Sequence, residues 1–158
     1  MARIHPFLWF DTQAEEAANF YVSIFPGSRI TGVTRYGAAG PGPAGSAMTV
    51  QFELDGRGFI ALNGGPHFKF NEAVSFSVTC AGQDEVDRYW SQLTAGGGEE
   101  GRCGWLKDRY GLSWQVTPVA LGQLLSDPDP GRSRRVMEAM LQMRKIDVAA
   151  LERARDAG

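Results

Sequence analysis

The strongest constraint on the fold of this chain is an internal repeat of apolar residues at helical spacing. Val86, Tyr89, Trp90 and Leu93 stand at positions i, i+3, i+4 and i+7, and they match Ala17, Phe20, Tyr21 and Ile24 at an offset of 69 residues. Such spacing is typical of a helix that buries one face. The repeat therefore predicts two copies of one supersecondary unit.

An opening strand precedes each predicted helix. The first, "RIHPFLWF" (3–10), is almost entirely apolar or aromatic, and the second, "AVSFSVT" (73–79), alternates apolar with polar residues. Thr12 and Glu15 have the spacing of a capping box, which would begin the first helix. Pro26 and Gly27 end it.

Each predicted helix leads into a hairpin region. In the first half, 28–36 and 46–54 flank the loop "GAAGPGPAG", and "FIALN" (59–63) returns after a turn at "DGRG". In the second half, "CGWLK" (103–107) and "LSWQV" (112–116) flank the turn "DRYG", and the glycine-rich stretch before them is the weakest strand candidate. Each half therefore has the order strand, helix, and up to three strands.

The residues after Pro118 follow a different, helical pattern. "ALGQLLSD" (120–127) is a short helical stretch that "PDPG" ends, and "SRRVMEAMLQM" (133–143) is predicted to be an amphipathic helix. A final turn, "DVAALERARDA" (147–157), completes the helical tail. The last two segments carry many apolar residues. We expect this tail to dock either on its own sheet or on a second subunit.

Composition narrows the class of protein. The net charge of −2 and scattered basic residues give no electrostatic footprint for nucleic acid. The chain has no apolar run of membrane-spanning length and no signal-peptide order at its start, so we expect a soluble, cytoplasmic protein without a membrane partner. Cys80 and Cys103 have no disulfide or zinc-site spacing, and both are predicted to be buried and reduced.

Four segments resemble a known family. "PFLWFDTQAEEAANFYVSIFPGSRI", "ALNGGPHFKFNEAVSFSVTC", "CGWLKDRYGLSWQVTP" and "LLSDPDPGRSRRVMEAMLQMRKIDVAALE" are similar to the PhnB-like branch of the vicinal oxygen chelate superfamily. This superfamily includes glyoxalase I, bleomycin-resistance proteins and extradiol dioxygenases. Members of the branch often carry the name 3-demethylubiquinone-9 3-methyltransferase. The likeness runs from about Ile4 to Glu152.

The resemblance implies an α+β fold. Two tandem βαβββ modules, at about 4–63 and 73–118, would form a curved mixed sheet with a concave ligand face. C-terminal helices at about 119–156 would complete a single domain spanning residues 1–158. The resemblance also implies a homodimer.

The resemblance further implies four positions for a divalent metal ion. Carried onto this chain, they are His5, then Leu62 or Ala61, then Val74 or Ser75, and Gln115. Only His5 and Gln115 can donate to a metal, and none of the four is a carboxylate. We therefore predict that the metal site is lost.

A cofactor is not expected either. S-adenosylmethionine is commonly bound by a glycine-rich turn between a strand and a helix. Here "GAAGPGPAG" (37–45) is interrupted by proline and opens no helix, and "GGG" (96–98) follows a helix. The methyltransferase name therefore has no visible cofactor motif behind it.

The predicted site is a pocket for a small molecule. Strand parity places His5, Phe7 and Trp9 on one face, and separates Ser113 and Gln115 from Trp114. The linker "NGGPHFKFN" adds further polar and aromatic candidates. The predicted ligand-binding residues are His5, Phe7, Trp9, Asn63, His67, Phe70, Ser113 and Gln115. The linker aromatics have the alternative role of closing the junction between modules.

Two functions fit this pattern. The first is a metal-independent module that binds a small planar or aromatic metabolite. The second is an enzyme on a small metabolite, with His5 or His67 as general base and Gln115 or Asn63 orienting an oxyanion. The sequence leaves open whether any reaction is catalysed.

Overall fold

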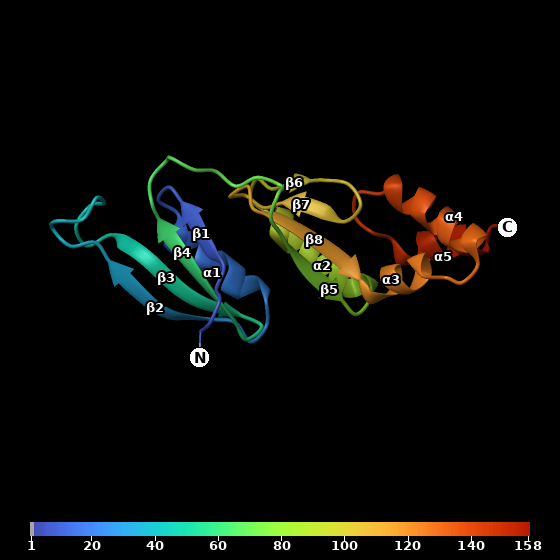
Figure 1. Ribbon diagram of the computed structural model, residues 1–158, viewed down its shortest axis with the longest axis horizontal. Coiled ribbons are helices and arrows are strands. Elements are labelled where there is room, and N and C mark those ends of the chain that lie inside the picture. The colour runs from blue at the N-terminus through green and yellow to red at the C-terminus, as the bar shows by residue number, and fades with distance from the viewer. Residues whose placement is uncertain (1) are drawn as a thin grey trace. The chain divides into compact units, whose positions relative to one another are not determined.

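The computed structural model describes residues 2–158, which divide into two compact units (Figure 1). The first unit ends at Phe70, and the second spans Asn71–Gly158. The boundary falls in the linker between the two halves of the sequence repeat. Each unit therefore contains one predicted module.

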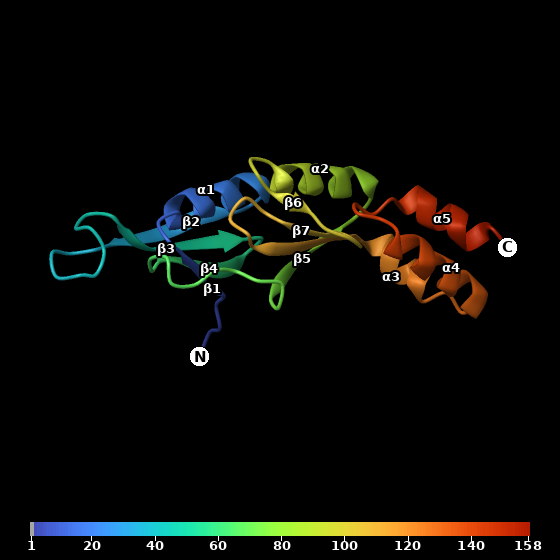
Figure 2. The ribbon, with the colours of Figure 1, turned by 90° about the horizontal axis from the view of Figure 1, so that it is seen from above.

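The first unit contains one helix and a four-stranded mixed sheet. Its elements are β1 (Phe7–Phe10), α1 (Ala14–Ile24), β2 (Arg29–Arg35), β3 (Ala47–Leu54) and β4 (Arg57–Asn63). The strand order is β1-β4-β3-β2, with β1 parallel to β4 and the other pairs antiparallel. This is the predicted βαβββ order. Figure 2 shows α1 lying across one face of the sheet.

The core of this unit consists of alternate residues of β3 and β4 that face α1. In β3 and β4 the residues facing α1 are buried, including Val50, Phe52, Phe59 and Ala61, while their neighbours are only partly covered. The ring of Phe52 stacks on that of Phe59 at 5.3 Å and lies 6.2 Å from that of Tyr21 in α1. The apolar face of the sheet and the apolar face of α1 therefore pack against each other in one layer.

The predicted capping box at Thr12 and Glu15 is wrong. The residue at the N-cap is Gln13, and its side chain forms no capping hydrogen bond. Instead, the first helical amide, that of Ala14, donates to Oδ1 of Asn63 at 2.8 Å. A long-range contact from β4 takes the place of the local motif.

The second unit repeats this topology. Its elements are β5 (Ser75–Cys80), α2 (Gln83–Thr94), β6 (Glu99–Glu100), β7 (Trp105–Lys107) and β8 (Ser113–Pro118). The order is β5-β8-β7-β6, and β5 is parallel to β8. The opening strands β1 and β5 thus hold equivalent places in their own sheets. The two-residue β6 is the strand that the sequence marked as weakest.

Three helices follow β8. They are α3 (Val119–Leu125), α4 (Pro130–Leu141) and α5 (Val148–Asp156). Asp129 caps α4 by accepting hydrogen bonds from the amides of Gly131 and Arg132. The helices share a small apolar core consisting of Leu121, Leu124, Val136, Ile146 and Leu151. The tail therefore buries much of its apolar surface against itself.

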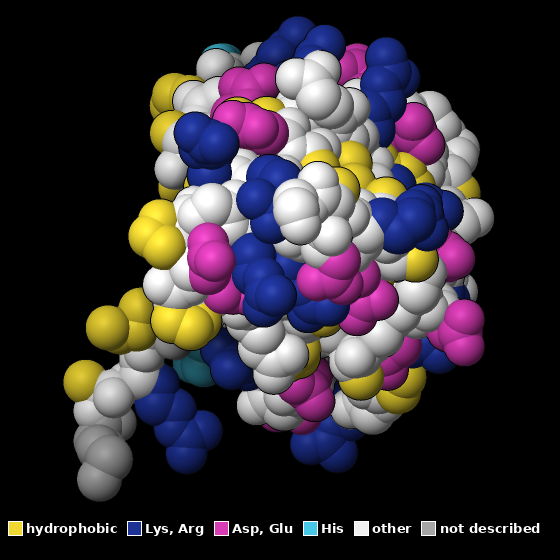
Figure 3. All heavy atoms as spheres, turned by 90° about the vertical axis from the view of Figure 1, so that its right-hand side faces the viewer, with side chains coloured by type: hydrophobic (Ala, Val, Ile, Leu, Met, Phe, Trp, Pro, Cys, Tyr) yellow, Lys and Arg dark blue, Asp and Glu magenta, His cyan; other side chains and the backbone are white. Residues whose placement is uncertain are grey.

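The tail also docks on its own unit. The amides of Cys103 and Gly104 donate to the carbonyls of Met143 and Arg144 at 2.9 and 2.8 Å. Lys145 forms an ion pair with Asp87 of α2 at 2.7 Å. Of the two docking alternatives, contact with its own chain is therefore present. Figure 3, which views the structure from the side of these helices, shows basic and acidic side chains interspersed on the surface.

The two cysteines differ in burial. Cys80 is completely buried at the end of β5, as predicted. Cys103 is only half-buried, because it lies in the turn before β7 with a positive φ of 55°. Both are free thiols. Within residues 2–158, none of the helices combines the length and apolarity needed to cross a bilayer.

Candidate ligand-binding faces

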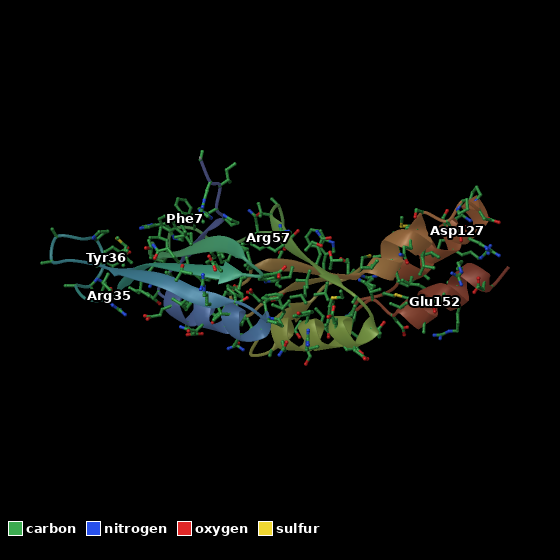
Figure 4. All side chains as sticks on the ribbon, turned by 90° about the horizontal axis from the view of Figure 1, so that it is seen from below. Phe7, Arg35, Tyr36, Arg57, Asp127 and Glu152 are labelled. Carbon is green, nitrogen blue, oxygen red and sulfur yellow. The ribbon has the colours of Figure 1, made fainter. Side chains whose placement is uncertain are left out.

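The face of the first sheet that points away from α1 carries exposed aromatic residues. Phe7 is 56% exposed, and Figure 4 shows it on the side of the sheet opposite α1. Trp9 shares this face, whereas Leu8 and Phe10 are buried towards α1. The parity predicted for Phe7 and Trp9 therefore describes β1 correctly. We call this surface the open face of the first unit.

His5 lies just before the strand rather than within it. β1 begins at Phe7, and the exposed His5 places Nδ1 3.3 Å from the carbonyl oxygen of Gly58. A methyl group on Gly58 would collide with the His5 ring. The imidazole therefore rests directly on the β4 backbone beside the open face.

The linker after β4 packs against the end of β1. The indole N–H of Trp9 donates to the carbonyl of Gly65 at 2.9 Å. Phe68, which is 65% exposed, contacts the Trp9 ring edge-on at 4.9 Å, while Phe70 contacts Phe10 at 5.3 Å. His67 is exposed in the same segment. Of the two linker phenylalanines, Phe68 is thus the one that extends the aromatic open face.

Asn63 has a structural position at the end of β4. Its Oδ1 accepts the Ala14 amide, and its Nδ2 donates to the carbonyl of Ala47 at 3.0 Å. Its main-chain oxygen accepts the hydroxyl of Tyr36 at 2.5 Å. Both polar atoms of the amide side chain therefore already have partners in the fold.

Sequence reasoning missed several residues of this face. Strand pairing sets Ile60 beside Phe7 and Leu62 beside Trp9, and both are only partly buried. On the next strand, Thr49 pairs with Leu62 and Gln51 with Ile60. The period-two pattern of β3 and β4 contained this signal, but only the register shows which residues become neighbours.

The corresponding face of the second sheet is polar. Ser75 pairs with Ser113, and Ser77 pairs with Gln115, whose Nε2 donates to the Ser75 hydroxyl at 3.0 Å. Trp114 is buried on the opposite, α2-facing side, with its ring 5.5 Å from that of Phe76. The sequence prediction that Ser113 and Gln115 share a face that excludes Trp114 is therefore correct for the strand.

A cavity of about 170 Å³ lies in the second unit. Its lining residues are Glu72, Glu99, Glu100, Gly101, Trp105, Leu106, Lys107 and Ser113. Lys107 forms an ion pair with Glu72, whose hydrogen bond raises the pKa of Lys107 and lowers that of Glu72. The hydroxyl of Ser113 is buried and has no hydrogen-bond partner within residues 2–158.

The residues present do not fit a divalent metal ion. Residues 2–158 contain no group of three or more His, Cys, Asp or Glu side chains arranged to hold a metal. Of the two candidate donors, His5 faces the Gly58 carbonyl and Gln115 is bonded to Ser75. Two neutral ligands without a carboxylate lack the donors and charge that such an ion needs.

The glycine-rich segments do not fit S-adenosylmethionine either. Residues 37–45 connect two antiparallel strands, β2 and β3, and Gly40 and Gly42 lie so close to the Tyr36 ring that a Cβ on either would collide with it. Gly98 follows α2 and lies against the backbone of Thr94 and Lys107. Neither segment joins a strand to the N-terminus of a helix.

Two βαβββ units, each with a four-stranded mixed sheet and one open face, define a protein of the vicinal oxygen chelate fold. Comparison with known families places the chain more narrowly. It belongs to the family described as 3-demethylubiquinone-9 3-methyltransferase, whose profile matches residues 2–117, and so to the PhnB-like branch of the superfamily. The matched residues end before α3, so the C-terminal helices lie outside this match.

Solved structures agree with this assignment. The PhnB protein from Bacillus cereus is 35% identical, with a TM-score of 0.68 over 75% of this chain and 100% of that chain. The protein PA1353 from Pseudomonas aeruginosa is 21% identical, with a TM-score of 0.61 over 75% and 98%. The fosfomycin resistance protein FosX from Mesorhizobium loti, 12% identical, shares the fold with a TM-score of 0.56 over 80% and 98%. No curated protein matches the chain.

Proposed function

We propose that this protein binds a small planar or aromatic metabolite without a metal ion. The observation that carries the proposal is the open face of the first unit, where Phe7 and Phe68 are more than half exposed and Phe68 contacts Trp9. Large aromatic side chains left on a sheet surface are typical of a binding surface. A flat ligand can stack on these rings and cover them.

We propose that the polar residues among the predicted ligand-binding residues orient the ligand through hydrogen bonds. In the first unit they are His5, Asn63 and His67, with Phe70 as a further aromatic side chain, and in the second unit they are Ser113 and Gln115 on the face of its own sheet. His5 and His67 are exposed and have a ring nitrogen available to a ligand, whereas the Asn63 side chain can offer only its remaining hydrogen-bonding capacity. Orientation by the two histidines is therefore the main polar contribution of the first unit.

A thermal-shift screen tests this proposal. A ligand that prefers the native state raises the apparent unfolding temperature. We expect planar aromatic metabolites to stabilise the protein, and divalent metal ions and S-adenosylmethionine to leave it unchanged. The protein would have a different role if only a metal or S-adenosylmethionine gave a shift.

Substitutions on the open face make the test specific. Phe7→Ala removes an exposed ring whose burial by a ligand is worth about 1.5 kcal/mol, so affinity should fall roughly tenfold. Val119→Ala, which removes an exposed apolar side chain from α3, is the matched control and should leave binding unchanged. Equal effects of the two changes would remove the open face from the site.

We also propose that the protein is a C2 homodimer to which the C-terminal helices contribute. Five apolar residues of the tail are buried in its own core and five more are partly buried against it, but Met137 and Leu141 remain 41% and 49% exposed one turn apart on α4. Two such side chains on one helical face suit a self-complementary contact. The remaining exposed area is smaller than the tail sequence alone suggested.

Light scattering tests the assembly. We expect about twice the 17.2 kDa chain mass at micromolar concentration. Replacing Met137 and Leu141 together by Lys should yield monomers, whereas Gln142→Lys, an added charge at the end of the same helix, should not. A dimer that survives the double substitution would exclude the tail from the interface, and a persistent wild-type monomer would exclude the dimer.

A further inference from the structure

The cavity of the second unit contains an unsatisfied polar group. Ser113 is 1% exposed, and its hydroxyl oxygen has no partner within residues 2–158. Ser113 also lines the cavity. A buried hydroxyl without a hydrogen bond costs free energy, so such groups are rare unless something else supplies the bond. A ligand atom in the cavity would supply it.

The charge of the lining favours a cation. The lining includes three acidic residues, Glu72, Glu99 and Glu100, and one basic residue, Lys107. Lys107 is paired with Glu72. One oxygen of Glu100 accepts the indole N–H of Trp90 at 2.7 Å, and the other lies 3.9 Å from Arg144. Within residues 2–158, the Glu99 side chain forms no hydrogen bond or ion pair, although its charge also attracts Lys107, so its carboxylate can accept a hydrogen bond from a ligand.

An aromatic wall completes the cavity. Trp105 lines it, is half-buried, and lies beside Gln115 in the register of β7 and β8. The face of an indole attracts a nearby cation through the ring quadrupole. The cavity volume of about 170 Å³ is close to the roughly 150 Å³ that holds a benzene molecule in an engineered apolar cavity. The ligand group is therefore small.

We propose that this cavity binds a primary ammonium group on a short organic stem, with the ammonium donating to Ser113 and Glu99 and the stem lying against Trp105. The inference goes beyond the proposed function, because the cavity lies within the second unit and uses none of the aromatic residues of the open face, and Ser113 is the one residue that the two proposals share. It names the cationic group that the second unit selects. The ion pair of Lys107 with Glu72 forms one side of the site and does not bind the ligand.

An anionic ligand is the competing interpretation, because Lys107 also lines the cavity. The two interpretations predict opposite results when that charge is removed. A cation would bind more tightly to Lys107→Met, since a like charge leaves and the Glu72 carboxylate is released. An anion would lose its only cationic partner in the lining.

A titration with three probes of similar size tests the proposal. n-Butylammonium, butyrate and 1-butanol would be added to the full-length protein in phosphate buffer, because amine buffers would compete. Binding is followed by the NMR signals of the Trp105 indole and the Ser113 amide. We expect saturable shifts with n-butylammonium alone. Saturable binding of butyrate, or of none of the three, would overturn the proposal, the latter leaving water as the partner of Ser113.

Three variants sharpen the test. Ser113→Ala should weaken n-butylammonium binding roughly tenfold, the effect of losing a hydrogen bond to a charged group. It should still fold, because it removes only an unsatisfied oxygen. Lys107→Met should strengthen binding by about threefold, a typical effect of one partly exposed charge. Ser77→Ala, on the same face but outside the lining, is the control and should change nothing.

The same experiment separates this inference from the proposed function. Phe7→Ala should leave n-butylammonium binding unchanged, because Phe7 belongs to the first unit. Aromatic ligands that stabilise the protein, together with no response to n-butylammonium, would refute the cavity alone. The reverse result would refute the aromatic open face alone. Loss of n-butylammonium binding in Lys107→Met would contradict the cation site, because removing a like charge should strengthen the binding of a cation.

Discussion

The carboxylate of Asp108 accepts the indole N–H of Trp114 at 2.9 Å in the buried core of the second unit. The other oxygen of the same carboxylate accepts the amides of Tyr110 and Leu112 at 2.8 and 3.1 Å. One acidic side chain thus closes the "DRYG" turn and anchors β8. The segment from the "DRYG" turn to β8 therefore has a structural role in the second sheet.

Removing this carboxylate should strongly destabilise the protein. Asp108→Ala removes the acceptor of three buried or partly buried N–H groups, so the free energy of unfolding should fall by about 3 kcal/mol. Trp114→Phe loses only the indole donor and should cost about 1–2 kcal/mol. Urea denaturation measures both. Asp84→Ala, an exposed acid at the start of α2, is the control, and a similar loss there would contradict the role of Asp108.

The side-chain amide of Gln83 holds the chain before α5. Its Nε2 donates to the carbonyl of Ile146 at 3.0 Å, and its Oε1 accepts the amide of Val148 at 2.9 Å. Gln83→Ala should therefore speed hydrogen exchange at the Val148 amide by about tenfold or more, since the C-terminal helices lose a paired anchor on α2.

Two comparisons make the Gln83 prediction specific. Gln83→Glu keeps the acceptor but places a carboxylate oxygen against the Ile146 carbonyl, so it should also loosen the contact. Gln123→Ala, an exposed glutamine in α3, should leave exchange at Val148 unchanged. Unaltered exchange in both Gln83 variants would mean that the core of the tail alone holds α5.

The topology could be predicted from the sequence because it depends on local periods. The apolar matches of 17–24 and 86–93 specified the two helices, and alternation specified which residues of β1 and β8 share a face. Each signal lies within about ten residues. The repeat of these local patterns in the two halves of the sequence excluded most other arrangements of the helices and strands.

Features that depend on distant contacts could not be predicted. The start of α1 is held by Asn63, which lies 49 residues along the chain from Ala14. The docking of the tail depends on Gln83, a polar residue whose partners are backbone atoms 63 and 65 residues away. The Ser113 hydroxyl lacks a hydrogen bond because no polar group of the described residues lies within bonding distance of it. No local pattern contains such information.

Because Cys80 is buried, we expect the free energy of unfolding to depend on pH in the alkaline range. Desolvation, followed by the nearby Glu85 carboxylate, raises the pKa of the Cys80 thiol from an ordinary value of 9.0 to about 11. The folded state holds this proton more tightly than the unfolded state. The contribution to stability is therefore complete below pH 9 and is lost as the pH rises through 11, by about 3 kcal/mol in total.

A difference measurement isolates this effect from other groups that titrate in alkali. The free energy of unfolding should fall less steeply between pH 9 and 11 in Cys80→Ala than in the wild type. Cys103→Ala, which alters the half-buried thiol, should retain the wild-type slope. Parallel curves for all three proteins would show that Cys80 makes no alkaline contribution.

Gly64 leaves the space that the Trp9 ring occupies. A Cβ at Gly64 would overlap the six-membered ring of the indole, and the linker there is held by a hydrogen bond from the Gly64 amide to Phe10 at 2.9 Å. Gly64→Ala should therefore push the indole out of its position, at a cost of about 1–3 kcal/mol, and break its bond to Gly65. Trp9 fluorescence should shift as the ring moves.

The functional consequence follows from the same displacement. If the aromatic open face binds the ligand, Gly64→Ala should weaken aromatic ligands although the substituted residue is not a contact itself. Gly122→Ala is the matched control, because a methyl group there meets nothing within 4 Å and lies in the helix α3, where alanine is favoured by about 0.5–1 kcal/mol. Unchanged ligand affinity in Gly64→Ala, with a displaced Trp9, would mean that this indole supports the linker and takes no part in binding.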